Sequence, residues 1–206
     1  MTTELCEIMG RHGSDKGSAS GDSWHNYTQY YDSLWSKQRT EKLRVFELGL
    51  GTNNTALPSN MGAAGKPGAS LRGWAEYFPN ATVFGADIDK DILFRSERID
   101  TFYCDQRSVA AISEMWAQPQ LESLFDIIID DGLHQYDANV TFFENSVQKL
   151  APNGVYIIED ICNADCPLFM AKISEWRQKY GLSVEFVPLA SAVNRCDNAL
   201  IVIRRP

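Results

Sequence analysis

Residues 125–160 read FDIIIDDGLHQYDANVTFFENSVQKLAPNGVYIIED, and this stretch decides the fold. Two apolar, β-branched runs, 125–129 and 155–158, each end abruptly in acidic residues, and the segment between them has the apolar spacing of an amphipathic helix. The pattern predicts a strand, a helix and a second strand. Neighbouring strands of an open parallel sheet run in the same direction, so we expect both acidic ends at one edge, where such sheets bind ligands.

The two acidic strand ends are Asp130-Asp131 and Glu159-Asp160, and His134 follows Asp131 by three residues. Three or four carboxylate oxygens at one edge suit a hard divalent cation such as Mg²⁺ or Mn²⁺. An imidazole beside that cation suits the metal-assisted deprotonation of a hydroxyl group. Two roles are open for Asp130, which could share the cation or hold the surroundings of a cofactor by hydrogen bonds. Strand alternation points its side chain away from that of Asp131.

The rest of the chain alternates short apolar runs with helical stretches. The pattern predicts strands at 43–48, 81–87, 99–104, 125–130, 154–159, 183–188 and 198–204. It predicts helices near 24–36, 69–78, 108–117, 136–150 and 166–180. This alternation favours an α/β fold with a doubly wound, seven-stranded, mostly parallel sheet, and the last two strands favour a closing antiparallel hairpin because no helix separates them. That arrangement is the Rossmann-like plan of class I methyltransferases.

A glycine-rich turn follows the first predicted strand, in the sequence VFELGLG at 45–51. Glycines there let backbone amides approach a ligand closely. A dinucleotide fingerprint would need a third glycine at position 54, where Asn54 stands, so a nicotinamide dehydrogenase is disfavoured. The acid-x-Gly-x-Gly pattern suits a nucleoside cofactor without a pyrophosphate, such as S-adenosylmethionine, and makes Glu47 and Gly49 candidate cofactor-binding residues.

Further cofactor contacts are expected at the ends of the next two strands and in the N-terminal segment. Asp87 ends one strand, where a carboxylate can accept both ribose hydroxyls. Asp105 and Gln106 follow the next strand, where the carboxylate can accept the adenine amino group. Lys16 is available to pair with the methionyl carboxylate. The polar, glycine-rich loop at 51–70 is either a lid over the site or a surface insertion.

Composition narrows the class of protein. The 206 residues suit a single domain over 1–206, with 1–40 as an N-terminal helical segment that covers the site. A net charge of −8, with no basic run longer than Arg204-Arg205, argues against nucleic-acid and anionic-membrane partners and favours a small-molecule substrate. We expect a cytoplasmic protein, since neither a signal peptide nor a membrane-spanning segment is evident. Five scattered cysteines suit reduced thiols and match no zinc pattern.

The chain resembles the metal-dependent sugar O-methyltransferases of macrolide biosynthesis, the mycinamicin type. The resemblance rests on Ser14-Asp15-Lys16-Gly17, FELGLG at 46–51, Gly85-x-Asp87-Ile88-Asp89, Cys104-Asp105-Gln106 and the unit from DDGLH at 130–134 to IED at 158–160. It implies metal ligation by Asp131, Glu159 and Asp160, and a general base at His134. It also implies a homo-oligomer. Leu133 departs from the usual small serine, and we expect no counterpart of the additional N-terminal domain of longer members, so their substrate contacts are not transferred.

The predicted function is therefore a metal-dependent O-methyltransferase that uses S-adenosylmethionine on a hydroxyl of a sugar or glycosylated natural product, as in antibiotic biosynthesis. A catechol or phenolic acceptor would use the same metal chelation. A non-catalytic S-adenosylmethionine-binding module should have lost the ligand and base positions, which are intact here. An aminopropyltransferase would need no cation and does not explain the acid-histidine unit.

Overall fold

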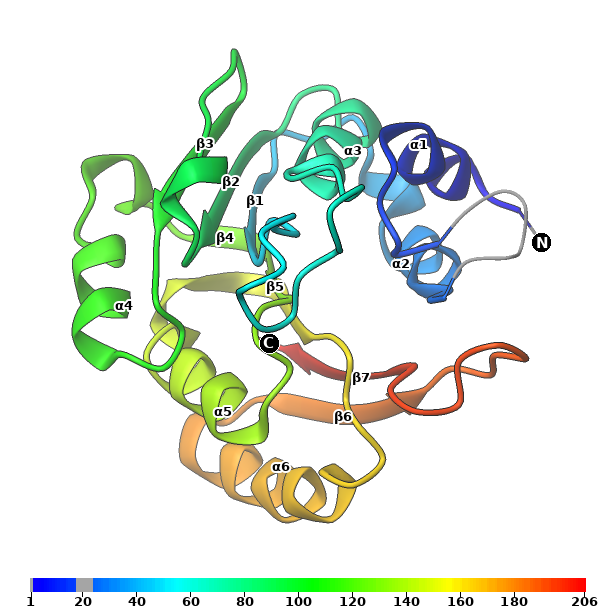
Figure 1. Ribbon diagram of the computed structural model, residues 1–206. Coiled ribbons are helices and arrows are strands. Elements are labelled where there is room, and N and C mark those ends of the chain that lie inside the picture. The colour runs from blue at the N-terminus through cyan, green and yellow to red at the C-terminus, as the bar shows by residue number, and fades with distance from the viewer. Residues whose placement is uncertain (1, 18–23) are drawn as a thin grey trace.

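Seven strands in the described residues form one sheet, in the order β3-β2-β1-β4-β5-β7-β6 (Figure 1). The structure is a computed structural model, and it describes residues 2–17 and 24–206. The strands are β1 (Arg44–Leu48), β2 (Thr82–Asp87), β3 (Ile99–Tyr103), β4 (Phe125–Asp130), β5 (Leu150–Ile158), β6 (Ser183–Pro188) and β7 (Ala199–Arg204). The first five run parallel, whereas β7 is antiparallel to both β5 and β6. The predicted α/β fold and its C-terminal antiparallel hairpin are confirmed.

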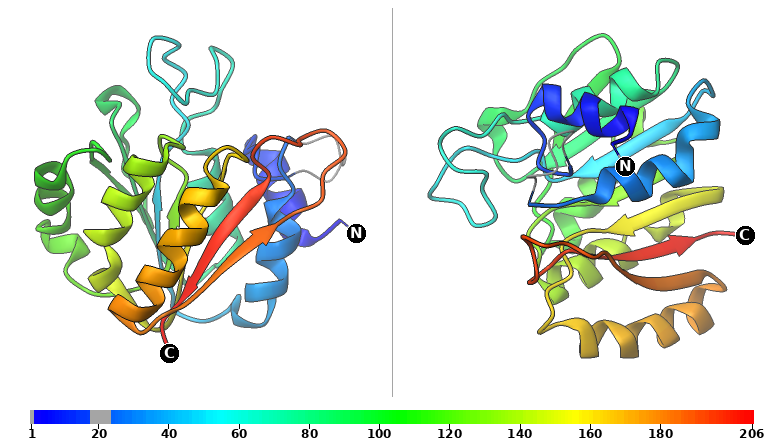
Figure 2. Two further views of the ribbon diagram at one scale, coloured as in Figure 1. Left: turned by 90° about the horizontal axis from the view of Figure 1, so that it is seen from below. Right: turned by 90° about the vertical axis from the view of Figure 1, so that its right-hand side faces the viewer.

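Helices cover both faces of the sheet (Figures 1 and 2). One face carries α1 (Glu4–His12), α2 (Tyr27–Trp35) and α3 (Ala69–Tyr77), and the other carries α4 (Val109–Trp116), α5 (Tyr136–Glu144) and α6 (Cys166–Tyr180). The central strands therefore alternate between two cores: Ile128 of β4 packs with α4–α6, whereas Ile127 and Ile129 pack with α1–α3. Burial on both faces explains the uninterrupted apolar runs in the sequence.

Three elements differ most from the prediction: one helix was not predicted, and two elements have other boundaries. Helix α1 was not predicted as a separate helix, yet the Thr3 side chain caps its start and Gly13 ends it in the left-handed conformation. The predicted helix at 136–150 ends at Glu144, and a short 3₁₀ turn follows. Strand β5 begins at Leu150, four residues earlier than predicted, and continues through Asn153, which adopts a positive φ, into Gly154.

The register of the parallel strands brings their carboxyl ends to one edge. Leu48 of β1 lies beside Asp130 of β4, and Asp130 lies beside Ile158 of β5. The residues that follow each strand are therefore neighbours, as predicted for the two acidic strand ends. None of the helices in residues 2–17 and 24–206 has the length and apolarity required to span a bilayer.

Candidate active site

A cavity of about 510 Å³ opens at the carboxyl edge of the sheet. That volume is within the range usual for small-molecule sites. Seven of the predicted site residues line it: Gly49, Asp87, Asp105, Gln106, Asp131, His134 and Asp160. The other four, Lys16, Glu47, Asp130 and Glu159, are almost fully buried and do not line the cavity. The predicted residues therefore form two shells, one facing the cavity and one supporting it.

Gly49 forms the closest approach between β1 and the acidic end of β4. Its φ is 92°, and a Cβ at this position would collide with the carbonyl oxygen of Asp131. The turn then places the backbone N–H of Leu50 2.7 Å from Oδ2 of Asp87. Only glycine fits this crowded, left-handed position, so the glycine motif brings the backbone to the cavity wall as predicted.

Asp87 and Asp105 face the same cavity but differ in environment. Asp87 is 7% exposed and accepts hydrogen bonds from the backbone N–H groups of Leu50 and Asp89. Burial raises the pKa of its carboxyl, against those hydrogen bonds. Asp105 lies at the rim, where a side-chain hydrogen bond from Arg107 lowers its pKa. Asp87 is thus a fixed acceptor in the wall, and Asp105 is a charged residue at the entrance.

Asp130 supports the wall from behind. Gln106 donates from Nε2 to both of its carboxylate oxygens, at 2.7 and 2.9 Å, and Asn139 donates to Oδ2 at 3.1 Å. Gln106 in turn accepts the backbone N–H of Leu133 at 2.7 Å. Burial raises the pKa of Asp130 to about 7. Of the two roles left open for Asp130, this arrangement supports the second, in which it holds the surroundings of the cavity by hydrogen bonds.

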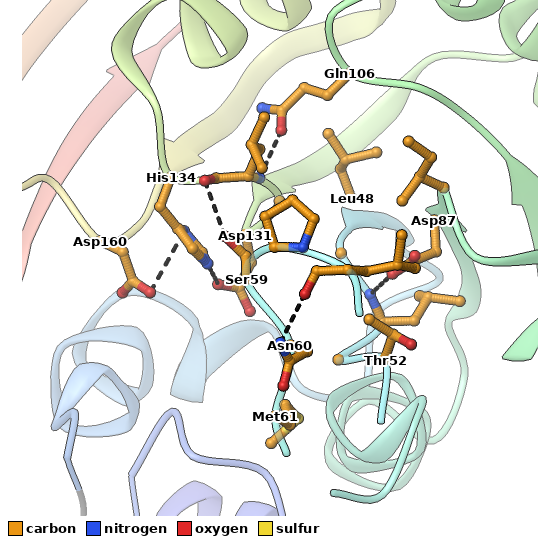
Figure 3. Close-up of a pocket in the computed structure, with 18 of the residues that line it drawn as sticks. Leu48, Thr52, Ser59, Asn60, Met61, Asp87, Gln106, Asp131, His134 and Asp160 are labelled. Carbon is orange, nitrogen blue, oxygen red and sulfur yellow. Dashed lines mark hydrogen bonds and ion pairs between the residues drawn. The ribbon is translucent and has the colours of Figure 1, made fainter. Parts of the chain in front are cut away.

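Asp131, His134 and Asp160 converge on one side of the cavity (Figure 3). Nδ1 of His134 lies 3.4 Å from Oδ2 of Asp160, and Nε2 lies 4.0 Å from Oδ1 of Asp131. Each of the three offers one potential ligand atom, and these atoms all lie within 4.8 Å of one another. Nδ1 of His134 is buried without a hydrogen-bond partner. An imidazole between two carboxylates, with a buried nitrogen that makes no hydrogen bond, fits a site that receives a cation or a hydroxyl.

The side chains of His134 and Asp160 are held in place by an unusual backbone. Both residues have a φ of 55°, a left-handed conformation that few non-glycine residues adopt. Such conformations cost free energy and persist where the surrounding structure imposes them, often at functional sites. The turns after β4 and β5 are therefore shaped to present these two side chains to the same point.

Glu159 points away from the cavity into a buried cluster with Lys16 and Glu47. The ammonium of Lys16 contacts Oδ2 of Asp131, lies 2.6 Å from Oε2 of Glu159 and lies 3.6 Å from Oε1 of Glu47. Burial opposes the charge on Lys16, but the surrounding carboxylates outweigh it and hold the lysine pKa well above its usual value. Burial likewise raises the pKa of Glu159, against the effect of Lys16.

This buried cluster bears on two of the predicted cofactor-binding residues, Lys16 and Glu47. The ammonium of Lys16 is engaged by carboxylates and is 1% exposed, so the arrangement does not support its predicted contact with a methionyl carboxylate. Glu47 is fully buried, where Ser70 and the indole N–H of Trp74 each donate to it at 2.5 Å. Nothing in the local sequence around Trp74 indicates this hydrogen bond to Glu47.

Helix α2 supplies two hydrogen bonds to the acids that were not predicted from the sequence. The hydroxyl of Tyr31 donates to Oε1 of Glu159 at 2.5 Å, and that of Tyr27 donates to Oδ1 of Asp160 at 2.6 Å. His25 stacks on Tyr27, with ring centroids 4.7 Å apart, and lines the cavity. Tyrosines four positions apart on a helix usually indicate packing, so only their distance to the acids identifies their role.

The loop between β1 and α3 projects beyond the carboxyl edge of the sheet (Figure 2), and its Ser59, Asn60 and Met61 form part of the cavity wall (Figure 3). Its residues 57–61 line the cavity, and Ser59 donates to the carbonyl oxygen of Leu133 at 2.9 Å. Leu133 lines the cavity beside His134. The loop therefore contacts the opposite wall, which is the position expected of a lid.

Most of this chain is similar in sequence to known O-methyltransferases. No family model matches the chain. The chain is 33% identical over 165 residues to 8-demethyl-8-alpha-L-rhamnosyl tetracenomycin-C 2'-O-methyltransferase of Streptomyces olivaceus, a match that covers 80% of this chain and 39% of that protein. It is also 33% identical over 166 residues to demethylmacrocin O-methyltransferase of Streptomyces fradiae, covering 81% of this chain and 38% of that protein.

A similar solved structure is that of the MycE methyltransferase from the mycinamycin biosynthetic pathway, in complex with Mg and SAH. The TM-score is 0.70 at 25% identity, and the match covers 99% of this chain and 55% of that one. The chain thus spans well under half the length of the two curated relatives and about half of that structure. The predicted resemblance is confirmed: the chain has the class I methyltransferase fold, and its homologues are sugar O-methyltransferases of glycosylated polyketide pathways.

Proposed function

We propose that the protein is an S-adenosylmethionine-dependent O-methyltransferase that acts, with a divalent cation, on a hydroxyl of a sugar or glycosylated natural product. The observation that carries the proposal is the convergence of Asp131, His134 and Asp160 on the cavity that Gly49 and Asp87 also line. A cation site and a nucleoside-binding wall thereby share one space. The name of the tetracenomycin relative includes a rhamnosyl group on its acceptor, and this name supports the acceptor class.

The wall between β1 and β3 would bind the cofactor. Asp87 is held by two backbone N–H groups, so both carboxylate oxygens are fixed in direction toward a ribose. Gln106 is held by Asp130, and Asp105 stands at the entrance, in a position suited to an adenine amino group. These contacts would orient the methyl group toward the acidic side of the cavity, which is the main contribution a protein makes to methyl transfer.

Asp131 and Asp160 would hold the cation, with Glu159 behind them as the third predicted ligand. Mg²⁺ or Mn²⁺, when bound, would lower the pKa of a coordinated acceptor hydroxyl. Nδ1 of His134 is buried against Asp160, so Nε2, on the side of Asp131, is the nitrogen that can accept the proton of that hydroxyl. Asp160 lies against the same ring and would stabilise the imidazolium that forms.

The first experiment measures binding and turnover separately. We expect S-adenosylhomocysteine to bind in calorimetry with or without EDTA, because the cofactor wall and the cation side use different residues. Methyl transfer to glycosylated polyketides should require Mg²⁺ or Mn²⁺ and be lost in Asp131→Asn and Asp160→Asn, because few carboxylates hold the cation. Asp137→Asn, on exposed α5 surface, is the matched control.

Three outcomes would redirect the proposal. Full activity in EDTA would exclude the metal mechanism. Transfer to catechols but not to glycosides would favour the phenolic acceptor, and cofactor binding without turnover on any acceptor would favour a binding module. A homo-oligomer and a cytoplasmic location remain predictions, which light scattering and cell fractionation would test.

A further inference from the structure

Lys16 is the one lysine or arginine that is fully buried in the described residues, and the proposed mechanism does not use it. Its side chain is 1% exposed, and lysines are almost never buried to this degree unless they are paired. Its ammonium contacts Asp131 and Glu159 and lies 3.6 Å from Glu47. A buried ammonium among three carboxylates is stabilised by them, and each carboxylate in turn depends on it.

The segment that carries Lys16 is built to fix its backbone. Ser14 Oγ accepts the N–H of Lys16 at 3.3 Å, and the N–H of Thr28 at the start of α2 donates to the carbonyl oxygen of Lys16 at 3.1 Å. Gly17 has a φ of 145°, and a Cβ there would collide with the Thr28 hydroxyl. Both backbone hydrogen-bonding groups of Lys16 are therefore engaged, and its side chain is directed into the buried cluster.

The ammonium joins the two strand ends that form the proposed cation site. It binds Oδ2 of Asp131, after β4, and Oε2 of Glu159, after β5. Oδ1 of Asp131 is left facing His134, and Oε1 of Glu159 is held by Tyr31. One oxygen of Asp131 is thus fixed by Lys16, and the other is directed toward the site.

The charges in the cluster also indicate that Lys16 holds the acids together. Four carboxylates lie close enough together to repel one another when they are ionised, those of Glu47, Asp131, Glu159 and Asp160. Burial strengthens this repulsion. Among the lysines and arginines in the described part of the chain, Lys16 is the one that contacts this cluster. Without its charge the carboxylates would repel each other and separate.

We propose that Lys16 is a positioning residue, a fixed internal cation that ties Asp131 to Glu159 and so holds Oδ1 of Asp131 in the direction that a divalent cation needs. This inference rests on the proposed function, because it assumes that these acids serve a cation site. It predicts that the protein keeps this arrangement when metal is removed. It also predicts that a divalent cation can partly replace a missing Lys16.

The experiment compares thermal unfolding of the wild type, Lys16→Met and Lys149→Met in EDTA and in saturating MnCl₂, together with calorimetric titration of Mn²⁺. Lys149 is a matched control because it is a partly buried lysine that bonds backbone carbonyls, of Leu121 at 2.8 Å and Trp116 at 3.3 Å. We expect the wild type to be folded in EDTA. We expect Mn²⁺ to raise the melting temperature of Lys16→Met at least about twice as much as that of the wild type, since binding stabilises the folded state more when it supplies the missing charge.

Lys149→Met should lose stability equally in both buffers, as a merely structural lysine would. If Lys16→Met does the same, while the wild type binds Mn²⁺, the positioning role is overturned and the proposed function stands. If the wild type binds no Mn²⁺, or unfolds in EDTA, the inference fails, and in the first case the cation site fails with it. Should Lys16→Met be insoluble in both buffers, Lys16→Met/Glu47→Gln, which removes one acid for the lost ammonium, is compared in the same way with Glu47→Gln alone.

Discussion

Nδ1 of His134 lies 3.4 Å from Oδ2 of Asp160, although the two residues follow different strands. Each has a φ of 55°, so both turns adopt the left-handed conformation at the residue that makes the contact. The pair therefore depends on two strained turns after β4 and β5. A substitution at His134 can remove the imidazole and leave this backbone undisturbed. Such a variant makes the role of the imidazole testable.

Replacing His134 with Asn should lower kcat by about 10²- to 10⁴-fold, the usual contribution of a general base. Asn tolerates the left-handed conformation better than most residues, so the backbone should keep its shape. Affinity for S-adenosylhomocysteine should change little, because the cofactor wall is separate. His12→Asn, at a surface contact with Glu76, is the control. A variant that melts early but keeps its kcat would assign His134 a structural role.

Replacing Asp87 with Ala should weaken S-adenosylhomocysteine binding by roughly 1 to 3 kcal/mol, as expected when charge-assisted hydrogen bonds to a ligand are lost. Mn²⁺ affinity should stay the same. Calorimetry with each ligand checks both expectations, and Asp91→Ala serves as a control outside the cavity lining. Unchanged cofactor affinity in Asp87→Ala would place the ribose elsewhere in the cavity.

Gly49→Ala should destabilise the protein far more than Gly181→Ala. Both glycines have positive φ, but a Cβ at Gly49 would collide with the Asp131 carbonyl, whereas nothing lies within 4 Å of a Cβ at Gly181. The second substitution should cost only about 1 to 2 kcal/mol, the penalty for a left-handed L-residue. Urea denaturation measures both. Equal losses would mean that β1 and β4 can separate at Gly49 without cost.

The metal-free protein should lose stability as pH rises from about 4 to 7. Burial raises the pKa of Asp130 from its ordinary 3.8 to about 7, so in this window the folded state binds a proton that the unfolded state has released. The contribution is present below the lower value and is lost as pH passes the higher one, with a slope of at most about 1.4 kcal/mol per pH unit. Burial shifts the pKa values of Glu159 and Asp160 in the same direction.

Denaturation in EDTA at pH 5 and 7.5 tests this prediction. Asp130→Asn should show a shallower decline than the wild type, because its side chain carries no proton to lose. Parallel declines in the two proteins would show that Asp130 is ionised throughout the range. Its donors, Gln106 and Asn139, would then be sufficient to solvate the charge.

The strand ends that carry Asp87, Asp131 and Asp160 could be predicted because parallel strands bring every carboxyl end to one edge. Alternation along a strand also separated Asp130 from Asp131 correctly. These inferences use only local sequence and the geometry common to such sheets. These inferences concerned only neighbouring pairs of strands and did not predict the order of all the strands across the sheet. They also placed the start of β5 too late, because Asn153 and Gly154 resemble a turn.

The contacts of Lys16, Tyr27 and Tyr31 could not be predicted, because they join the N-terminal segment to residues more than 100 positions away. Nothing in the local pattern distinguishes a tyrosine that donates to Glu159 from one that only packs. Helix α1 had an apolar face of Leu5, Ile8 and Met9, a helical spacing that was present in the sequence but interrupted by polar residues.

The hydrogen bond between Tyr31 and Glu159 spans 128 positions of the chain. During synthesis, helix α2 leaves the ribosome long before β5 exists. Tyr31 and Tyr27 therefore cannot form these hydrogen bonds until β5 has been made. Contacts of such long range slow folding, because the intervening chain must be ordered before they form. The acidic side of the cavity should accordingly be among the last parts of the molecule to assemble, after the sheet beneath it has closed.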